Sequence, residues 1–268
     1  MQAQPSHSAA ISEALPVLYR DEFMVAVQKP SGMLVHRTAL DRHETRIAMS
    51  LVRDQLGQRV YPVHRLDKPT SGVLLFALDA DSARTLGDAF STHRVRKDYL
   101  AIVRGWPPLG GIIDYPLKQK EDNKGRKIGH LQRMETAITL YHRLATTTVP
   151  VSVDGRYRHT RYALVRARPV TGRRHQIRRH LKTRSHPIVG DSNYGKGVHN
   201  RFFAREYGVQ RLLLCAERLA VPHPASDEII EIRARPDADL CTVAQQIGLT
   251  LPPHWDAARI EGLQSTAG

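Results

Sequence analysis

Apolar residues fall along this chain in short runs of strand length, and fewer stretches repeat them at helical spacing. The runs rich in Val, Ile, Tyr, Phe and Thr predict strands at residues 17–19, 24–27, 73–78, 97–105, 136–144, 159–168, 211–220 and 228–234. Apolar positions at helical spacing predict helices at residues 45–56 and 81–92; we also expect a helix entered from a glycine turn at 171–181 and a short helix near 237–247. Because most strands follow one another through hairpin-like turns, the pattern favours an α+β fold with a mixed, mainly antiparallel sheet flanked by helices.

No internal repeat and no low-complexity linker divides the sequence, which predicts a single domain over residues 14–248. Residues 1–13 are polar and rich in Ala and Ser, so we expect a loose N-terminal tail, and we expect residues 249–268 to form a C-terminal tail. The segment 118–133 is charged and lacks periodicity, which predicts a long loop. Its lysines would either contact a nucleic-acid backbone or be solvated only, and the sequence leaves both readings open.

The charge of the chain points to a polyanionic partner. Its 268 residues carry 40 Lys and Arg against 26 Asp and Glu, a formal charge of +14, which favours nucleic acid over an acidic membrane surface. No apolar stretch is long enough to span a bilayer, and the first residues lack a secretory signal pattern. The two isolated cysteines, Cys215 and Cys241, suit a reducing compartment, so we expect a cytoplasmic protein. The 14 histidines lack metal-ligand spacing, and we expect them at the surface or facing RNA, with no metal site.

The candidate chemistry is concentrated in the segment 64–72, which leads into the apolar run at 73–78. Asp67 stands there beside His64, Arg65 and Lys68, on a loop at the mouth of a predicted strand. Taken alone, an Asp in such a loop is most often a turn former that accepts a hydrogen bond from its own backbone.

The whole segment, however, resembles the signature loop of the RluA-type pseudouridine synthases, and the matching residues are His64, Arg65, Leu66, Asp67, Thr70, Ser71 and Gly72. Segments 97–105, 172–180, 189–195 and 214–216 resemble later motifs of that family and occur in the expected order. One motif would be weak evidence, whereas several in order are strong. Cys215 departs from the pattern, since the family usually has His at that position.

The resemblance implies the pseudouridine synthase fold, with an active-site cleft across the sheet of one catalytic domain, and an isomerase that needs no cofactor. Asp67 would be the catalytic carboxylate, attacking C1′ of the ribose or abstracting a sugar proton, and both routes stay open. Arg178 would pair with it and keep it ionised. Tyr99 would stack on the uracil and could accept the proton from C5. A paired uridine reaches such a site only by base flipping, and Arg65 could fill the vacated place.

The remaining expectations concern RNA. We expect contacts to RNA from His64, Arg65, Thr70, Arg173, Arg174, His175, Arg179 and Lys182, with His64 orienting its loop rather than transferring protons. The closest likeness is to the tRNA-modifying branch of the family, which implies tRNA as partner and uridine 65, where the T stem meets the acceptor stem, as target. We expect a monomer without a protein partner. The alternatives are a ribosomal RNA substrate with the same chemistry, and a basic RNA-binding protein that has lost catalysis.

Overall fold

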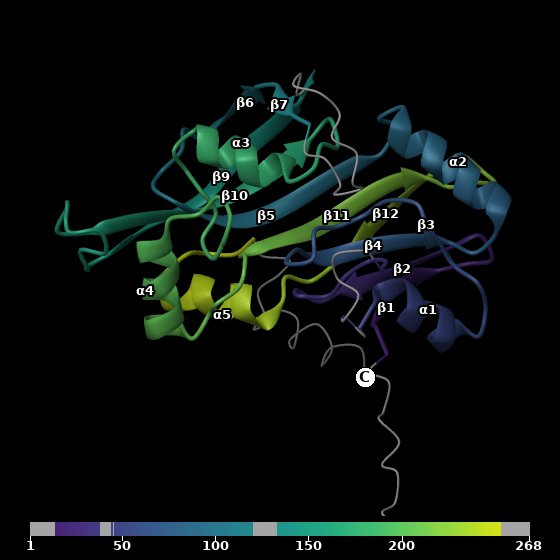
Figure 1. Cartoon of the computed structure of the whole chain (residues 1–268), viewed down its shortest axis with the longest axis horizontal. Helices are drawn as coiled ribbons and strands as arrows, with labels where there is room; N and C mark the ends of the chain where they lie inside the picture. The colour runs from purple at the N-terminus through teal and green to yellow at the C-terminus, as the bar shows by residue number, and fades with distance from the viewer. Residues whose placement is uncertain (1–13, 38–43, 45, 120–132, 253–268) are drawn as a thin grey trace, which may run out of the picture.

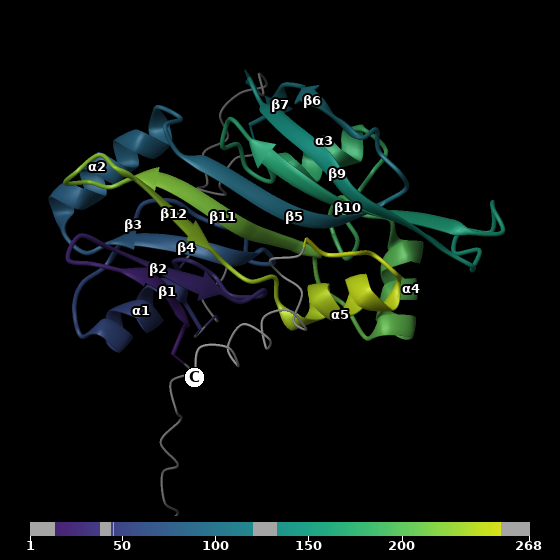
Figure 2. The same cartoon turned by 180° about the vertical axis from the view of Figure 1, so that it is seen from behind.

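A large twisted sheet carries the fold in the computed structural model, which describes residues 14–37, 44, 46–119 and 133–252 (Figures 1 and 2). Its principal strands are β1 (Val17–Arg20), β2 (Met24–Lys29), β4 (Ser71–Ala77), β5 (Arg96–Arg104), β6 (Gly110–Asp114), β9 (Ile138–Val149), β10 (Thr160–Pro169), β11 (Leu214–Pro222) and β12 (Ile229–Arg233). The short strand β3 (Tyr61–Pro62) pairs with β4, and β7 (Leu117–Lys118) pairs with β8 (Met134–Glu135) in a separate small ladder. The helices are α1 (Ala48–Leu56), α2 (Ala80–Ser91), α3 (Gln176–Thr183), α4 (Gly197–Tyr207) and α5 (Ala238–Gln246).

The strand order brings distant parts of the chain together at the middle of the sheet. Along the sheet the strands run β1-β2-β4-β11-β5-β10-β9-β6, and β12 pairs with the outer part of β11. Neighbours are antiparallel except β4 and β11, which pair in parallel through Ser71–Cys215 and Gly72–Ala216. The predicted mixed, mainly antiparallel sheet is therefore confirmed.

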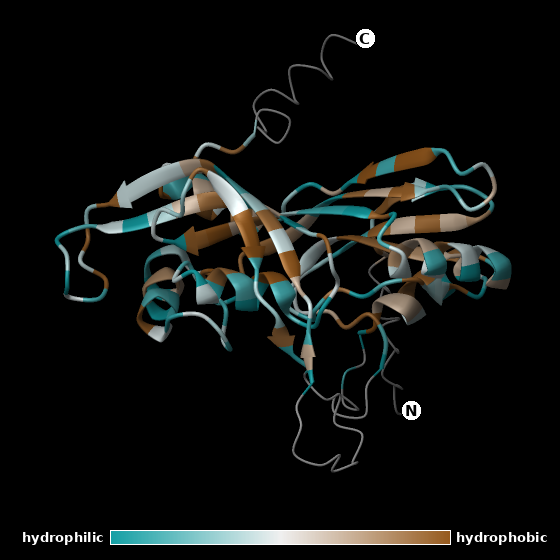
Figure 3. Cartoon of the chain, turned by 90° about the horizontal axis from the view of Figure 1, so that it is seen from above, coloured by the Kyte–Doolittle hydropathy of each residue, from teal (hydrophilic) through white to brown (hydrophobic). Residues whose placement is uncertain are grey.

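Alternating side chains bury both faces of the sheet. On β2, Val25 and Val27 pack toward α1, whereas Met24 and Ala26 pack toward α2, so these two helices cover opposite faces of the β2–β4 half. The other half is covered by α3 on one face and by α4 and α5 on the other. Figure 3 shows the result, with hydrophobic colour mostly on the strands and hydrophilic colour on the outer faces of the helices. Leu249, just after α5, is also buried in this core.

Most predicted elements are present, with shifted ends. The hairpin of β1 and β2, the strand β4 and the helices α1, α2 and α5 lie where the pattern predicted them. Asp79 begins α2, since its carboxylate accepts the backbone N–H of Ser82 at 2.8 Å. The helix predicted at 171–181 starts only at Gln176, because His175 has a left-handed backbone (φ 55°). Of the loop predicted at 118–133, residues 120–132 lie outside the described residues, as do residues 1–13 of the N-terminal tail.

Apart from the two-residue strands β3, β7 and β8, two elements were not predicted. The helix α4 has adjacent rather than spaced aromatic residues, Phe202 and Phe203, and no side chain caps its start at Lys196. The strand β6 begins with Gly110 and Gly111 and exposes Ile112, so it lacks the alternation of a half-buried strand. No helix in the described ranges is both long and apolar enough to cross a membrane.

Candidate active site

The loop that carries Asp67 is tied down by its own backbone and by the loop after β2. The backbone N–H of Thr70 donates to the carbonyl of Asp67 at 2.9 Å, which closes a tight turn around the carboxylate. The N–H of Gly32 donates to the carbonyl of Lys68 at 2.9 Å, and the hydroxyl of Ser31 donates to the carbonyl of Pro69 at 2.8 Å. These bonds fix the place of Asp67 at the entrance to β4.

Lys29 supports the same loop from inside the protein. Its fully buried ammonium group donates to the carbonyls of Pro30, Met33 and Lys68 at 2.9, 2.9 and 3.2 Å. Burial lowers the pKa of Lys29 to about 7, although the negative charge of Asp67 acts in the opposite direction. One side chain therefore joins two loops directly beneath the candidate catalytic carboxylate.

Gly72 lets the loop enter the sheet. Its backbone has φ +113°, and a Cβ at this position would lie 2.2 Å from the carbonyl oxygen of Ala216 on β11. Any larger residue would push β4 and β11 apart at their parallel pairing. Gly72 at the end of the segment 64–72 is thus a packing requirement of the strand behind Asp67.

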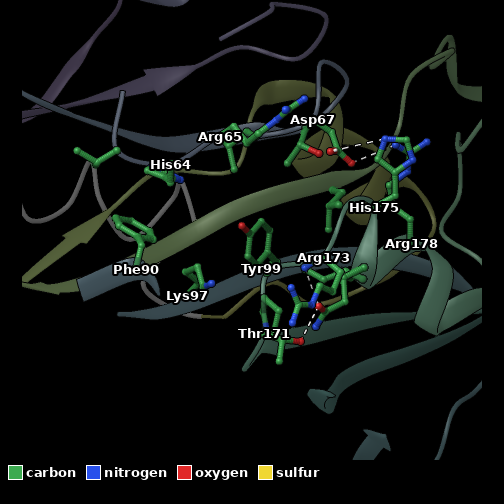
Figure 4. A pocket seen from close by; sticks show the side chains of 18 of the residues that line it. His64, Arg65, Asp67, Phe90, Lys97, Tyr99, Thr171, Arg173, His175 and Arg178 are labelled. Atoms are coloured by element: carbon green, nitrogen blue, oxygen red, sulfur yellow. Dashed lines mark hydrogen bonds and ion pairs between the residues drawn. The ribbon is translucent and has the colours of Figure 1, made fainter. Parts of the chain in front are cut away.

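Arg178 lies between two carboxylates. Its Nη1 donates to Oδ2 of Asp67 at 3.1 Å, while Nε and Nη2 donate to the two carboxylate oxygens of Asp191, both at 2.8 Å (Figure 4 shows the bond to Asp67). Asp191 and Arg178 are almost completely buried, whereas Asp67 is partly exposed. Burial would raise the pKa of Asp191, but the hydrogen bonds and charge of Arg178 outweigh burial and hold that pKa below its usual range. Arg178 is thereby fixed by Asp191 and presents one remaining edge to Asp67.

The turn after Asp191 holds the same guanidinium from another side. Asp191 accepts the backbone N–H groups of Asn193 and Tyr194 at 2.9 and 3.0 Å, which shapes the turn. The ring of Tyr194 then lies 5.1 Å from the guanidinium carbon of Arg178, a cation–π contact. The hydroxyl of Tyr194 is 3.0 Å from Nδ1 of His175, whose Nε2 lies 3.8 Å from Oδ1 of Asp67. Asp67 therefore faces Arg178 and His175, both supported by one turn.

These residues border a cavity of about 400 Å3, a size typical of small-molecule sites. Tyr99, from β5, stands between Asp67 on one side and Thr171 and Arg173, which precede α3, on the other (Figure 4). Burial raises the pKa of Tyr99 well above its usual range, and the negative charge of Asp67 adds to the effect. The phenol stays protonated near neutral pH, so it is a poor proton acceptor and a good apolar platform.

His64 forms part of the cavity wall, stacked on Phe90 with ring centroids 4.8 Å apart. Its Nε2 accepts the backbone N–H of Leu75 in β4 at 3.0 Å, so the imidazole acts as an acceptor and links the loop to the strand. Burial, with the positive charge of Lys97, lowers the pKa of His64 to about 3. A histidine that stays neutral and hydrogen-bonded to the backbone orients the loop and does not transfer protons near neutral pH.

The low pKa of His64 has a consequence for stability. The unfolded chain protonates this histidine as the pH falls through 6.5, whereas the folded protein does so only near pH 3, so stability present above pH 6.5 is lost on acidification. Between pH 6.5 and 5 we expect the wild type to lose about 1–2 kcal/mol of unfolding free energy that His64→Gln does not lose. Urea unfolding at the two pH values measures this difference. The exposed His159, changed to Gln, is the control, and an equal loss in His64→Gln and the wild type would contradict the assignment.

The predicted RNA-binding residues occupy different surroundings. Arg65, Arg174 and Lys182 are exposed, whereas Thr70, a residue of the Asp67 loop, is buried against the cavity. Arg173 donates to the carbonyl of Thr136 and pairs with Glu135 at 3.1 Å, and Arg179 donates to the carbonyl of Lys118 at 3.0 Å. Figure 4 shows Arg65 beside Asp67 on one side of the cavity and Arg173 on the other.

The expectation that histidines are surface or RNA-facing residues is wrong for two of them. His180 is completely buried and bonds to Thr139 and to the carbonyl of Tyr115, and buried His199 bonds to the hydroxyl of Tyr162 at 2.8 Å. Both satisfy polar groups inside the core. Within the described residues, no group of three or more His, Cys, Asp or Glu could hold a metal ion.

Cys215, which departs from the expected motif, is fully buried in the core between β4 and β5. Burial raises the pKa of its thiol to about 12, so the thiol stays protonated and packs as a small apolar group. The position has no access to the cavity side of the sheet, where its neighbours Leu214 and Ala216 point.

Three residues of the site had no role assigned from the sequence. Asp191 and Tyr194 lie in the segment 189–195, where the motif marked a turn without showing that it supports Arg178. Lys97 lines the cavity, and burial lowers its pKa. The signal for Asp191 was a lone acidic residue between apolar and glycine positions, which is also typical of an ordinary turn.

Comparison with known proteins agrees with this geometry. The family model described as RNA pseudouridylate synthase matches residues 23–183, which include the Asp67 loop, Tyr99 and Arg178. The tRNA pseudouridine synthase C of Vibrio cholerae is 47% identical over 221 residues, which cover 82% of this chain and 90% of that protein. The tRNA pseudouridine synthase C of Pasteurella multocida is 50% identical over 224 residues, covering 83% and 92% of the two chains.

Solved structures give the same fold. Human RNA pseudouridylate synthase domain containing 4 superposes with a TM-score of 0.70 at 26% identity, covering 90% of this chain and 97% of the human one. Human RNA pseudouridylate synthase domain containing 1 superposes with a TM-score of 0.65, and at 23% identity it shows the fold alone. The expected pseudouridine synthase fold is confirmed.

Proposed function

Because the chain belongs to the RNA pseudouridylate synthase family, we propose that it isomerises a uridine of tRNA to pseudouridine, with Asp67 as the catalytic carboxylate. One observation carries the proposal: Asp67 borders a cavity of base-binding size and is held there by Arg178, in a chain close to half identical to tRNA pseudouridine synthases. The arrangement supplies what the reaction needs, an oriented carboxylate beside a partly enclosed space for a ribose and a base.

The reaction breaks the N1–C1′ bond of the uridine and joins C5 of the same uracil to C1′, so that the proton on C5 passes to solvent water and N1 takes one from it. Substrate and product are isomers, and the balance needs no oxidant, reductant or co-reactant. Asp67 either attacks C1′ or removes a sugar proton to give a glycal, and both routes use the same ionised carboxylate. Arg178 donates to one carboxylate oxygen, Oδ2, which keeps the carboxylate oriented toward the cavity.

Tyr99 and Arg65 take different parts in this proposal. The phenol of Tyr99 stacks against the uracil while it turns, and because burial raises its pKa, the phenol stays protonated near neutral pH during this step. A uridine in a stem reaches Asp67 only after leaving the helix, so the proposal includes base flipping. Exposed Arg65, beside Asp67, is placed to enter the vacated position in the stack.

The exposed basic residues around α3 are assigned to the RNA backbone. Exposed Arg174 and Lys182 lie on or just before α3, the helix that carries Arg178, so phosphates bound there would be close to the flipped nucleotide. We assign uridine 65, where the T stem meets the acceptor stem, as the target. This finer assignment rests on the likeness to tRNA pseudouridine synthase C.

The experiment that tests this function maps pseudouridine in tRNA and ribosomal RNA from a strain that lacks the protein. We expect one tRNA pseudouridine, at position 65, to be lost, to return with the wild-type gene, and to stay absent with Asp67→Asn. Loss of a ribosomal pseudouridine with intact tRNA would contradict the tRNA assignment and keep the chemistry. No loss in either RNA would leave the alternative of a basic RNA-binding protein without catalysis.

A further inference from the structure

The β9–β10 hairpin extends beyond the rest of the molecule, as Figures 1 and 2 show from opposite sides. Its tip has the sequence Gly155-Arg156-Tyr157-Arg158-His159. Tyr157 is 71% exposed, the highest value among the exposed large apolar and aromatic side chains of the described residues. The flanking Arg156, Arg158 and His159 are exposed as well. An aromatic ring between cations at a protruding tip needs an explanation, since a core role is impossible here.

Hydrogen bonds within the hairpin fix the conformation of the tip. The hydroxyl of Thr160 donates to the carbonyl of Val151 at 2.7 Å and accepts the backbone N–H of Val153 at 3.1 Å. The carboxylate of Asp154 accepts the backbone N–H of Arg156 at 3.3 Å. These bonds fix the turn from which Tyr157 projects, so the ring is presented at a low entropic cost.

The charges that the tip exposes to solvent are positive. Its carboxylate, Asp154, is only 19% exposed and pairs with Arg104 at the base, 3.5 Å away. Within the described residues Arg156 and Arg158 form no ion pair, so both guanidinium groups remain available for anions. Cations that flank an exposed ring match a nucleic-acid strand, in which phosphates flank each base.

A path of basic and aromatic residues leads from the site to this tip. It begins at the end of α3 with exposed Lys182 and Arg184 and passes to His186, whose Nδ1 donates to the carbonyl of Arg104 at 2.9 Å. Trp106, two residues after Arg104, is 39% exposed, and the guanidinium carbon of Arg161 lies 4.6 Å from the centre of its ring. Arg161 is the second residue of β10 and follows the tip directly.

From these features we propose that residues 156–159 form a second RNA-contact site, in which Tyr157 stacks on an unpaired nucleotide of the tRNA and Arg156 and Arg158 bind the phosphates on either side. The inference rests on the proposed function, because it assumes that the RNA bound at Asp67 is long enough to reach the hairpin. The site increases the affinity for tRNA and helps to position it, and it takes no part in the chemistry.

The test is binding of an unmodified, full-length tRNA transcript by fluorescence anisotropy, with single-turnover pseudouridine formation measured on the same variants. Loss of one stacked base weakens binding about 5- to 100-fold, and we expect this for the Kd of Tyr157→Ala. Tyr157→Phe keeps the ring and should bind within about twofold of the wild type. At saturating RNA, Tyr157→Ala should react at the wild-type rate.

The arginines are tested by salt dependence. Arg156→Ala with Arg158→Ala should reduce the slope of log Kd against log salt by roughly 1.4 to 1.8, from two lost phosphate contacts. Arg53→Ala removes an exposed arginine from α1, away from the hairpin, and should leave the slope unchanged.

An unchanged Kd for Tyr157→Ala would overturn the inference. A tip that binds a protein partner and not RNA would give this result. A loss of binding in Tyr157→Phe as large as in Tyr157→Ala would overturn the stacking role. These results differ from failure of the proposed function, in which the wild type binds tRNA and forms no pseudouridine.

Discussion

Asp67→Asn is expected to reduce pseudouridine formation by more than about 100-fold while tRNA binding stays close to that of the wild type. The amide is nearly isosteric, so it fits the turn closed by the N–H of Thr70, but it can neither attack C1′ nor accept a sugar proton. Single-turnover rates at saturating RNA, beside a filter-binding titration, separate the two effects. Circular dichroism shows whether the variant is folded.

Glu44→Gln is a matched control for the loss of one negative charge near the loop, because Glu44 pairs with Lys68 at 2.7 Å outside the cavity lining. It should react at nearly the wild-type rate. Turnover of Asp67→Asn above about one-hundredth of the wild-type rate would remove Asp67 from its assigned role.

Arg178→Lys should lower the single-turnover rate at saturating RNA by about 10- to 100-fold, because an ammonium group cannot bond to Asp67 and hold both oxygens of Asp191. Lysine keeps the positive charge, so the buried Asp191 is not left without a cation. In Arg178→Ala the buried Asp191 would have no cation beside it, which would lower the free energy of unfolding by about 3–5 kcal/mol. The lysine variant therefore separates the orientation of Asp67 from folding.

Arg179→Ala is the matched control for phosphate binding, since Arg179 is the next residue of α3 and does not line the cavity. It should weaken RNA binding and leave the saturated rate unchanged. If excess RNA restored the rate of Arg178→Lys, Arg178 would be a phosphate contact only, and Asp67 would need another partner, such as Arg65 or His175.

The hydrophobic pattern located the elements whose position depends on their own residues. The strand β4 is a fully buried apolar run, and α2 begins at a capping aspartate, so each could be located from its own residues. The helix α4 could not, because paired aromatic residues and glycines at its start imitate a loop. Its burial depends on side chains of β10, such as Tyr162, whose ring contacts that of Phe203 and which lies far earlier in the sequence.

The contacts of the site depend even more on residues that are distant in sequence. The Asp67–Arg178 hydrogen bond joins residues 111 positions apart, and no periodicity in the chain connects them. Their pairing was implied by the family resemblance alone and depends on a sheet in which β11 lies between β4 and β5. The late start of α3 has a local cause that the pattern did not show. The side chain of Gln176 accepts from the backbone of Arg173 and from Thr171, which replaces the first helical turn.

The most direct test of the account is release of tritium from C5 of uridine-labelled tRNA transcript by the purified protein without added cofactor. We predict one equivalent released per tRNA and a pseudouridine mapped to position 65, with no release above background from a transcript that has cytidine there. Release from both transcripts alike would contradict the target. No release from the wild-type transcript, with RNA bound and the protein folded, would contradict the assignment of Asp67 and its cavity as a pseudouridine-forming site.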